Sequence, residues 1–327
     1  MKPFDYVAPG SIESSVHALR GAGAEEARLL AGGTDLLPLM KAHIAAPRLV
    51  VSLKQVADLP RDIVLDTKGL RIGALATLAD IEGHPDVARD FATLAQAAGT
   101  AATAQLRNMA TLGGTLLQRP RCWYFRNESF HCWLKGGAEC HARAGENGLH
   151  ALFDTGPCRA VHPSDVACAL MALDARVELR SARAARSVSL REFFAPPIEE
   201  RRVETILGAR EVVTAVRVPR PAAGFRSIYL KAMDRAVWAF ATVSVAAAAR
   251  VEAGRLEDLR LVLGGVAAVP WPVEDAVRSL QGAQPDEGLI AQAARDALAG
   301  AEPLRMNGYK VPLAESLIRR ALHALTV

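Results

Sequence analysis

Four of the five cysteines fall within one segment of the chain. Nine, seven and seventeen residues separate them in turn: Cys122, Cys132, Cys140 and Cys158. Four thiolates from one loop can complete a zinc site or a [4Fe–4S] cluster. The spacing matches neither the paired Cys-x-x-Cys motif of zinc ribbons nor the ferredoxin run. The residues alone therefore leave iron–sulfur, structural zinc and unliganded thiols all open.

Ring side chains are concentrated in the same segment, although aromatic residues make up only 5% of the chain. They are Trp123, Tyr124, Phe125, Phe130 and Trp133. Rings packed around a metal centre would limit the access of water. The segment also holds His131, His141, His150 and His162, which we interpret as polar loop residues rather than ligands. The fifth cysteine, Cys168, lies among apolar residues at helical spacing and is expected in the core.

Two Gly-Gly-Thr motifs flank apolar residues of strand character. The first is Gly32-Gly33-Thr34-Asp35, and the second is Thr111-Leu112-Gly113-Gly114-Thr115. Paired glycines let backbone N–H groups approach a phosphate, and a threonine hydroxyl can add a donor. Neither motif is the Gly-x-Gly-x-x-Gly fingerprint or a Walker loop. Each alone is equally well a tight turn, with Asp35 as a helix cap, but together they could hold one long phosphate-bearing cofactor.

Composition bounds the class of protein. The chain has 327 residues, 50% hydrophobic content and a net charge of +4, which argues against disorder and gives no case for nucleic acid. The charged runs 180–186 and 199–202 are interpreted as solvated faces. The longest apolar run, 237–249, is too short for a membrane span and is interpreted as a buried strand or helix. Without a signal peptide the chain is expected to be cytoplasmic, or periplasmic if a signal-bearing partner carries it.

Periodicity and turn signals predict an α+β protein. Helices are expected at 11–22, 36–43, 77–82, 91–102, 272–280, 289–299 and 313–325, and a further helix is expected to begin at 164. Ser11 is the expected cap of the helix 11–22, and Thr77 that of the helix 77–82. Strands are expected at 28–31, 48–53, 63–65, 70–74, 176–180, 188–194, 211–219, 225–231, 241–250 and 256–266. The Pro-rich stretch 219–224 is the best domain boundary.

The residues that carry these motifs resemble a known family. They are Leu29 to Leu36, Leu106 to Leu116, His162 to Asp165, and Leu263 to Ala267 followed by Pro270-Trp271. In combination they resemble the FAD-binding subunit of molybdenum hydroxylases, the xanthine dehydrogenase family. The resemblance implies a PCMH-type FAD-binding domain of the vanillyl-alcohol-oxidase fold at 1–220, with subdomains at 1–57 and 58–220. A C-terminal flavoprotein domain of the CO dehydrogenase kind is implied at 221–327.

Within this family the insert 117–161 resembles that of bacterial aldehyde oxidoreductase flavin subunits, in the stretch from Gln118 to Arg126. Those subunits carry an additional [4Fe–4S] cluster, and the 4-hydroxybenzoyl-CoA reductase flavin subunit also has a cluster loop. The resemblance therefore favours iron–sulfur over zinc and implies Cys122, Cys132, Cys140 and Cys158 as ligands.

The resemblance also implies the FAD contacts. The pyrophosphate is expected on 31–35, Asp165 near the edge of the flavin ring, Lys231 close by, and Val213 packed on the ring. Thr115 departs from the family, which usually has Asn there, so that hydrogen bond is in doubt. The full implied set is Leu29, Leu30, Ala31, Gly32, Gly33, Thr34, Asp35, Leu36, Thr111, Gly114, Thr115, Asp165, Val213 and Lys231.

The implied function is electron transfer inside a larger oxidoreductase. A large molybdenum-cofactor subunit would oxidise an aldehyde or an N-heterocycle, and a small [2Fe–2S] subunit would pass electrons to the FAD of this chain. The rivals are the flavin subunit of a 4-hydroxybenzoyl-CoA reductase-like enzyme or an N-heterocycle hydroxylase, an autonomous flavin oxidase, and a zinc-stabilised binding protein without redox work. No catalytic acid or base for an autonomous oxidase is evident.

Overall fold

The N-terminal part of the chain builds a small parallel sheet. The computed structural model describes residues 1–21 and 26–326, and within them the strands form three sheets. The first has the order β1 (Asp5–Val7), β3 (Leu49–Ser52), β2 (Ala27–Leu30). Its helices are α1 (Ile12–Gly21) and α2 (Leu36–Lys41). The β2–α2–β3 connection is a parallel crossover, so the glycine segment 32–35 lies between a strand and a helix, as the sequence predicts.

The central sheet is antiparallel and has five strands. Its order is β4 (Ile63–Asp66), β5 (Gly69–Gly73), β8 (Val212–Val218), β6 (Arg176–Arg180), β7 (Ala185–Ser189). The associated helices are α3 (Leu78–Gly83), α4 (Pro85–Asp90), α5 (Ala92–Thr100), α6 (Ala104–Arg107), α7 (Leu112–Leu116), α9 (Asp165–Ala172) and α10 (Leu190–Phe193). The predicted cap of α3 is confirmed: Thr77 accepts from the Asp80 backbone, and Asp80 accepts from the Thr77 backbone.

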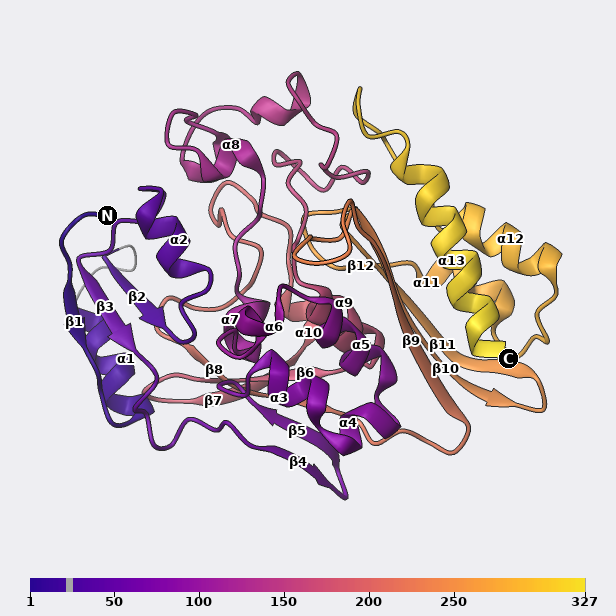
Figure 1. The fold of residues 1–327 in the computed structure, drawn as a ribbon, viewed down its shortest axis with the longest axis horizontal. Helices are drawn as coiled ribbons and strands as arrows, with labels where there is room; N and C mark the ends of the chain where they lie inside the picture. The colour runs from indigo at the N-terminus through magenta and orange to yellow at the C-terminus, as the bar shows by residue number, and fades with distance from the viewer. Residues whose placement is uncertain (22–25, 327) are drawn as a thin grey trace.

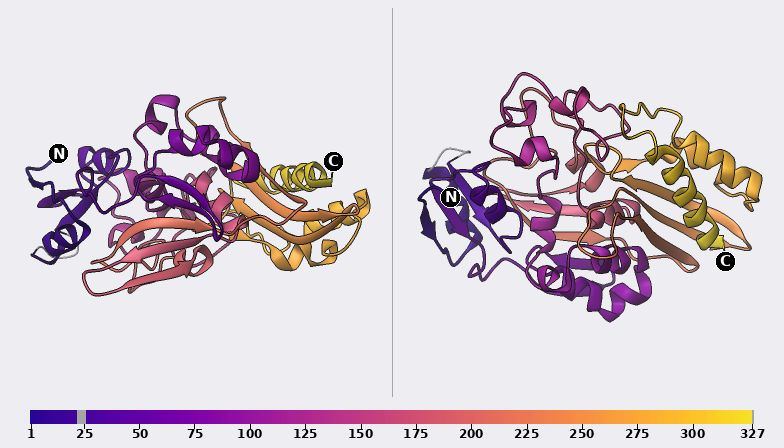
Figure 2. Two further views of the ribbon diagram at one scale, coloured as in Figure 1. Left: turned by 90° about the horizontal axis from the view of Figure 1, so that it is seen from below. Right: turned by 45° about the horizontal axis from the view of Figure 1, so that its top comes forward.

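The third sheet is antiparallel, in the order β12 (Trp271–Pro272), β11 (Arg255–Gly264), β10 (Val243–Glu252), β9 (Phe225–Ala232). The C-terminal helices are α11 (Glu274–Val277), the 3-10 turn Arg278–Leu280, α12 (Glu287–Asp296) and α13 (Lys310–Thr326). Figure 1 shows the three sheets following one another across the molecule, with α12 and α13 outermost, and Figure 2 shows the same order from two other sides.

The alanine-rich strand β10 is buried on both faces. Ala246 and Ala248 belong to the core shared with α5 and α9, whereas Ala247 and Ala249 belong to the core under α13. Side chains alternate along a strand, so a strand between two helical layers needs apolar residues at every position. Small residues let both layers approach closely, which explains the apolar run without any membrane role. No helix in the described chain is long and apolar enough to span a bilayer.

The first part of that apolar run was wrongly predicted to be buried. Val237 and Trp238 are 60% and 61% exposed, and Phe240 is 46% exposed. They lie in the loop between β9 and β10, outside the sheet, where no layer covers them. Apolar composition alone does not distinguish an exposed loop from the strand that follows it.

The cysteine insert contains no strand among its described residues. It is a chain of short turns: α8 (Trp123–Arg126) and the 3-10 turns Trp133–Lys135 and His141–Arg143. In Figure 1 the insert stands above the central sheet, between α2 and the segment that leads into α13. It has a core of its own, which includes Leu39 of α2 and the side chains Tyr124, Phe125 and Trp133.

The predicted elements are otherwise largely confirmed. The expected helix 11–22 is present to Gly21, and residue 22 lies outside the described residues. The strand and turn expected at 188–194 are the end of β7 followed by the short helix α10, which is capped by Ser189. The helix expected at 272–280 begins only at Glu274, because Trp271–Pro272 pairs with β11 as an edge strand.

Candidate functional site

The two glycine motifs meet in space. A methyl group on Gly32 would stand 1.8 Å from the carbonyl oxygen of Met109, so the first motif touches the backbone just before the second. Gly33 has a φ of +76°, a left-handed conformation that favours glycine. The segment 31–37 is half-buried rather than enclosed. Both sets of backbone N–H groups therefore border one region of the molecule.

The second motif is a short helix and not the tight turn that its sequence suggested. Thr111 caps α7 by accepting a hydrogen bond from the Gly114 backbone N–H, with an O–N distance of 3.2 Å. Gly113 lies against Ala74, which leaves little room for a side chain at that position. Thr115 is buried in the same helix, and α7 packs against β8, the strand that carries Val213. The first N–H groups of α7 are already satisfied: Leu112 donates to the Ala76 carbonyl, Gly113 to the Ala74 carbonyl and Gly114 to the Thr111 hydroxyl.

Asp35 does not act as a side-chain cap. It occupies the N-cap position of α2 without a capping hydrogen bond. Its carboxylate instead lies 2.7 Å from Arg121 and 2.7 Å from Arg126, and it accepts from the Arg119 backbone N–H at 2.9 Å. The first glycine motif is thereby tied to the start of the cysteine insert. Arg121 directly precedes Cys122, so one ion pair links the two candidate sites.

Asp165 and Lys231, which were expected to lie near each other, form a buried ion pair. The Lys231 Nζ lies 2.7 Å from Asp165 Oδ2, and the Tyr229 hydroxyl donates to Asp165 Oδ1 at 2.6 Å. Asp165 is the first residue of α9, whereas Tyr229 and Lys231 project from the same face of β9. Burial raises the pKa of Asp165, and the Lys231 ammonium opposes this rise. Tyr229 was not predicted as a site residue. Because side chains two residues apart on a strand share one face, its position two residues before Lys231 could have indicated it.

A small hollow lies beside this pair. Its volume is about 30 Å³, room for about one water molecule, so it does not by itself accommodate a large ring. The exposed loop residue Phe240 covers one side, with the Arg121 guanidinium 4.8 Å from the centre of its ring. Among the residues that line it are Arg121, His162, Asp165, Cys168, Phe240 and Ser244. Cys168 is only 2% exposed, which confirms its expected place in the core.

The four insert cysteines gather in one place. Cys140 and Cys158 share a thiol–thiol hydrogen bond, which lowers the pKa of Cys140 to about 6 and raises that of Cys158. Charge interactions join Cys122 to both Cys132 and Cys140. None of the five cysteines, all of which the structure describes, forms a disulfide. In the described chain no group of three or more His, Cys, Asp or Glu side chains is arranged to hold a metal ion.

His150 and His162 lie in loops, as we expected, but both are buried. His150 is 2% exposed, and its Nε2 lies 3.2 Å from Cys122 Sγ. Burial lowers the pKa of His150 to about 4, so the ring is neutral near pH 7 and can donate one hydrogen bond. His162 is 4% exposed and lines the hollow beside Asp165. The His150 ring contacts Cys122, 28 residues earlier, and the His162 ring packs edge-on against Phe194; neither contact follows from a local sequence pattern.

The charged run 199–202 is not simply a solvated face. Arg202 donates to the carbonyl oxygens of Trp133 and Gly137, and its guanidinium lies 4.7 Å from the centre of the Trp133 ring. Glu199 accepts from Trp133 Nε1 at 3.0 Å. These contacts hold the 3-10 turn Trp133–Lys135, which follows Cys132, in place. The other run, 180–186, has Arg180 and Arg186 half-exposed in ion pairs and fits the expected solvated face.

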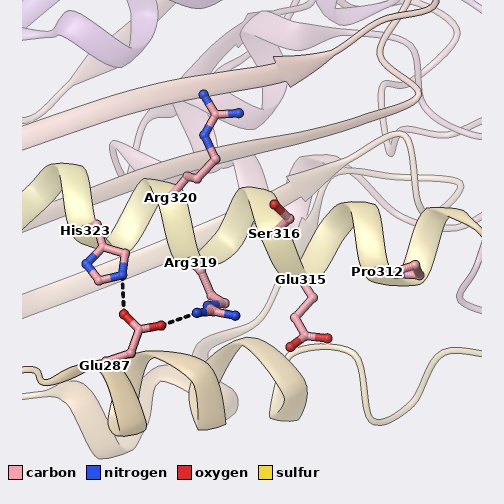
Figure 3. A pocket seen from close by; sticks show the side chains of 7 residues that line it. All are labelled: Glu287, Pro312, Glu315, Ser316, Arg319, Arg320 and His323. Carbon is pink, nitrogen blue, oxygen red and sulfur yellow. Dashed lines mark hydrogen bonds and ion pairs between the residues drawn. The ribbon is translucent and has the colours of Figure 1, made fainter.

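A larger hollow lies elsewhere. It is an open groove of about 530 Å³ between α12 and α13. Figure 3 shows Glu287 reaching across it to Arg319 and His323. These side chains are exposed and form surface ion pairs with one another. None of them is close in sequence to a glycine motif or a cysteine. We therefore place the functional site at the glycine motifs, Asp165 and the insert.

Comparison with known proteins identifies the family. Residues 2–221 match the family described as FAD binding domain in molybdopterin dehydrogenase, and residues 228–325 match the CO dehydrogenase flavoprotein C-terminal domain. The chain belongs to the FAD-binding subunits of the molybdenum hydroxylases. It is thus a subunit of an oxidoreductase, and the expected fold class is confirmed.

Two curated relatives cover nearly the whole flavin subunit. The aldehyde oxidoreductase FAD-binding subunit PaoB of Escherichia coli is 39% identical over 327 residues, which is 98% of each chain. The carbon monoxide dehydrogenase medium chain of Hydrogenophaga pseudoflava is 28% identical and covers 98% of this chain and 96% of its own. Among the solved structures, carbon monoxide dehydrogenase from the same organism superposes with a TM-score of 0.79 at 27% identity, covering 100% and 99%. Quinoline 2-oxidoreductase from Pseudomonas putida 86 gives 0.76 at 25%, covering 100% and 98%.

Proposed function

We propose that this flavin subunit carries FAD and a [4Fe–4S] cluster in a heterotrimeric molybdenum enzyme that oxidises an aldehyde. A large partner would hold the molybdenum cofactor, and a small partner would deliver electrons from [2Fe–2S] centres. The observation that carries the proposal is the gathering of four free thiols directly behind Arg121, which itself reaches both Asp35 and the hollow at Asp165. The similarity to an aldehyde oxidoreductase subunit supports the reaction class.

The proposed FAD site extends from the glycine motifs to Asp165. Among the described residues no acceptor bonds the backbone N–H groups of Gly32 and Gly33, so these groups can donate to a phosphate, whereas the first N–H groups of α7 already bond the Ala76 and Ala74 carbonyls and the Thr111 hydroxyl. The same segments supply the remaining expected contacts, from Leu29 and Leu30 in β2 through Thr34 to Leu36 at the start of α2. The donors of the first motif are the ones that would hold a pyrophosphate.

At the other end, Asp165 and Lys231 would face the flavin ring. Asp165 already accepts two hydrogen bonds, but a carboxylate has capacity for a further donor such as a ring N–H. The Lys231 ammonium would stabilise negative charge near the ring. Val213, buried in β8, would pack on one face. A ring at this place would take the space that Phe240 now covers, which its half-exposed side chain can vacate.

FAD accepts single electrons and releases pairs, which suits a relay between one-electron centres and a two-electron acceptor. The chain's own residues hold the cofactor, exclude water and place charge near it. The four thiols of the insert are the ligand type that an iron–sulfur cluster uses, and they share one apolar cluster with Tyr124, Phe125 and Trp133. As placed, no three of the described side chains converge on a metal position, so a cluster would require the thiols to move together. The Ala160 backbone N–H adds a contact to Cys158 Sγ at 3.5 Å.

Cofactor analysis of the purified complex tests this proposal. We expect FAD released by denaturation at about one per chain and iron with acid-labile sulfide beyond that of the [2Fe–2S] partner. Zinc in place of the additional iron would support a structural metal site instead and refute the cluster. Turnover by the isolated chain would favour an autonomous oxidase. A substrate screen of the complex would separate aldehyde oxidation from N-heterocycle hydroxylation or 4-hydroxybenzoyl-CoA reduction.

A further inference from the structure

Arg121 is a cation of the insert that lies between the two ends of the proposed FAD site. Its Nη1 lies 2.7 Å from Asp35 Oδ1, at the end of the first glycine motif. The same guanidinium lies 4.8 Å from the centre of the Phe240 ring and lines the hollow beside Asp165. Burial lowers the pKa of Arg121 to about 10, so the group stays positively charged near pH 7. One side chain therefore contacts the first motif and borders the place expected for the flavin ring.

The guanidinium of Arg121 has one donor left over. Its Nη1 bonds Asp35 and its Nη2 donates to Gln118 Oε1 at 3.1 Å, whereas its Nε is buried without an acceptor among the described residues. The neighbouring Arg126 differs, because its Nε donates to the Pro120 carbonyl at 2.8 Å. A buried donor without a partner costs free energy, which a ligand that accepts from it would recover. Arg121, unlike Arg126, therefore has an Nε–H group left for a ligand.

The charges around Asp35 leave room for an anion. Its Oδ1 is shared by Arg121 and Arg126, each 2.7 Å away, so one carboxylate faces two cations. The adjacent Arg119 has the buried Glu204 as its partner, with 3.5 Å between Nε and Oε2, and burial raises the pKa of Glu204. The ion pairs beside the first motif therefore leave a surplus of positive charge.

The other acidic side chains near the insert do not balance this surplus. Glu199, which lies outside the insert, pairs with Arg202. The acids of the insert itself form ion pairs that include neither Arg121 nor Arg126. These pairs are Glu128 with His43, Glu139 with His141, Glu146 with Arg305, and Asp154 with Arg143 and Arg159. The first three of these acids are largely exposed, so solvent and salt screen their charges from Arg121.

A phosphate oxygen is the acceptor that suits this place. The backbone N–H groups of Gly32 and Gly33, in the motif that Arg121 contacts, also lack an acceptor among the described residues. A guanidinium presents planar N–H donors that match phosphate oxygens. The Phe240 ring that lies against Arg121 is 46% exposed, so it can move aside for a ligand. Since Arg121 also lines the hollow at Asp165, it would reach the phosphate on the flavin side of the cofactor.

We propose that the insert contributes Arg121 to the FAD site, where its Nε–H group donates to the flavin-side phosphate. This inference rests on the proposed FAD site and needs no metal at the cysteines. Asp35 then has two effects: it orients Arg121, and its negative charge competes with the phosphate for the same guanidinium. Removal of the guanidinium should therefore weaken FAD binding, whereas removal of the carboxylate charge should not.

The first test is titration of the deflavinated whole complex with FAD. In Arg121→Gln we expect the Kd to rise about tenfold, because a charged donor is lost and Asp35 keeps one cation fewer. In Asp35→Asn, which keeps the size of the side chain and removes its charge, the Kd should stay at the wild-type value or fall. A rise in Asp35→Asn as well would show that Arg121 acts only by holding the first motif, and would overturn the proposal.

Phosphorus NMR of the bound FAD gives a local readout, since each phosphate has its own resonance. We expect Arg121→Gln to shift one resonance. Arg126→Gln is the matched control, because it also removes one cation from Asp35 but no spare donor, and it should shift neither. Equal shifts in both variants would assign the effect to Asp35 and refute a direct contact. A wild-type complex without FAD would refute the proposed function itself, whereas wild-type FAD affinity in Arg121→Gln would refute only this inference.

Discussion

Gly32→Ala should separate the two glycine motifs and weaken FAD binding. The new methyl group would stand 1.8 Å from the Met109 carbonyl oxygen. Since non-bonded contacts to carbon settle at roughly 3.5 Å, the two backbones would have to move apart by more than ~1.5 Å. Overpacking of this kind costs ~1–3 kcal/mol, and a backbone neighbour cannot rotate away as a side chain can.

That cost should appear mainly in cofactor affinity. The clash would displace the first motif from the backbone before the second, and with it the N–H groups that would hold the pyrophosphate. A penalty of ~1–3 kcal/mol then weakens the Kd roughly 5- to 150-fold. The assay is titration of the deflavinated complex with FAD, followed by quenching of flavin fluorescence. Circular dichroism would show that the variant is folded.

Gly83→Ala is the matched control. A Cβ at Gly83 has no heavy atom within 4 Å, so the same change of residue adds no clash there. We expect its FAD affinity to equal that of the wild type. If Gly32→Ala also bound FAD with the wild-type Kd while remaining folded, the two motifs would not act together on the cofactor, and the proposed pyrophosphate site would be wrong.

Three further predictions concern the insert and the buried ion pair. Cys140→Ser should lose the additional iron yet retain FAD, because Cys140 lies far along the insert from the Asp35 contacts; unchanged iron by elemental analysis would contradict the ligand set. Arg121→Gln should weaken FAD binding about tenfold in the same titration, because it breaks the ion pair with Asp35 and removes the guanidinium beside Phe240 at the hollow. An unaltered Kd would show that Arg121 does not support the FAD site. Lys231→Gln removes the charge that opposes the raised pKa of Asp165, so folding then favours the protonated carboxyl. Its stability relative to wild type should therefore fall as the pH rises above the ordinary pKa range of an aspartate, measured by chemical denaturation. A difference in stability that does not depend on pH would exclude this explanation.

The sequence determined most of the local structure and the chemistry available to the site. Period-two and helical patterns, turn residues and caps located most of the longer strands and helices, since these signals act between residues a few positions apart. Short elements such as β1, α4, α6, α7 and α8 were not predicted. The glycine pairs and the cysteine set were also evident, because glycine and thiol chemistry does not depend on distant partners.

The tertiary structure alone decided how these parts are joined. Asp35 looks like a helix cap in sequence but pairs with Arg121 and Arg126, more than 80 residues away. Lys310 precedes the helix expected at 313–325, but it is the first residue of α13 and is buried against carbonyls about 160 residues earlier. Such contacts leave no periodic trace in either segment. They form only when the insert folds between α2 and α13, so their charges and burial are properties of the assembled molecule.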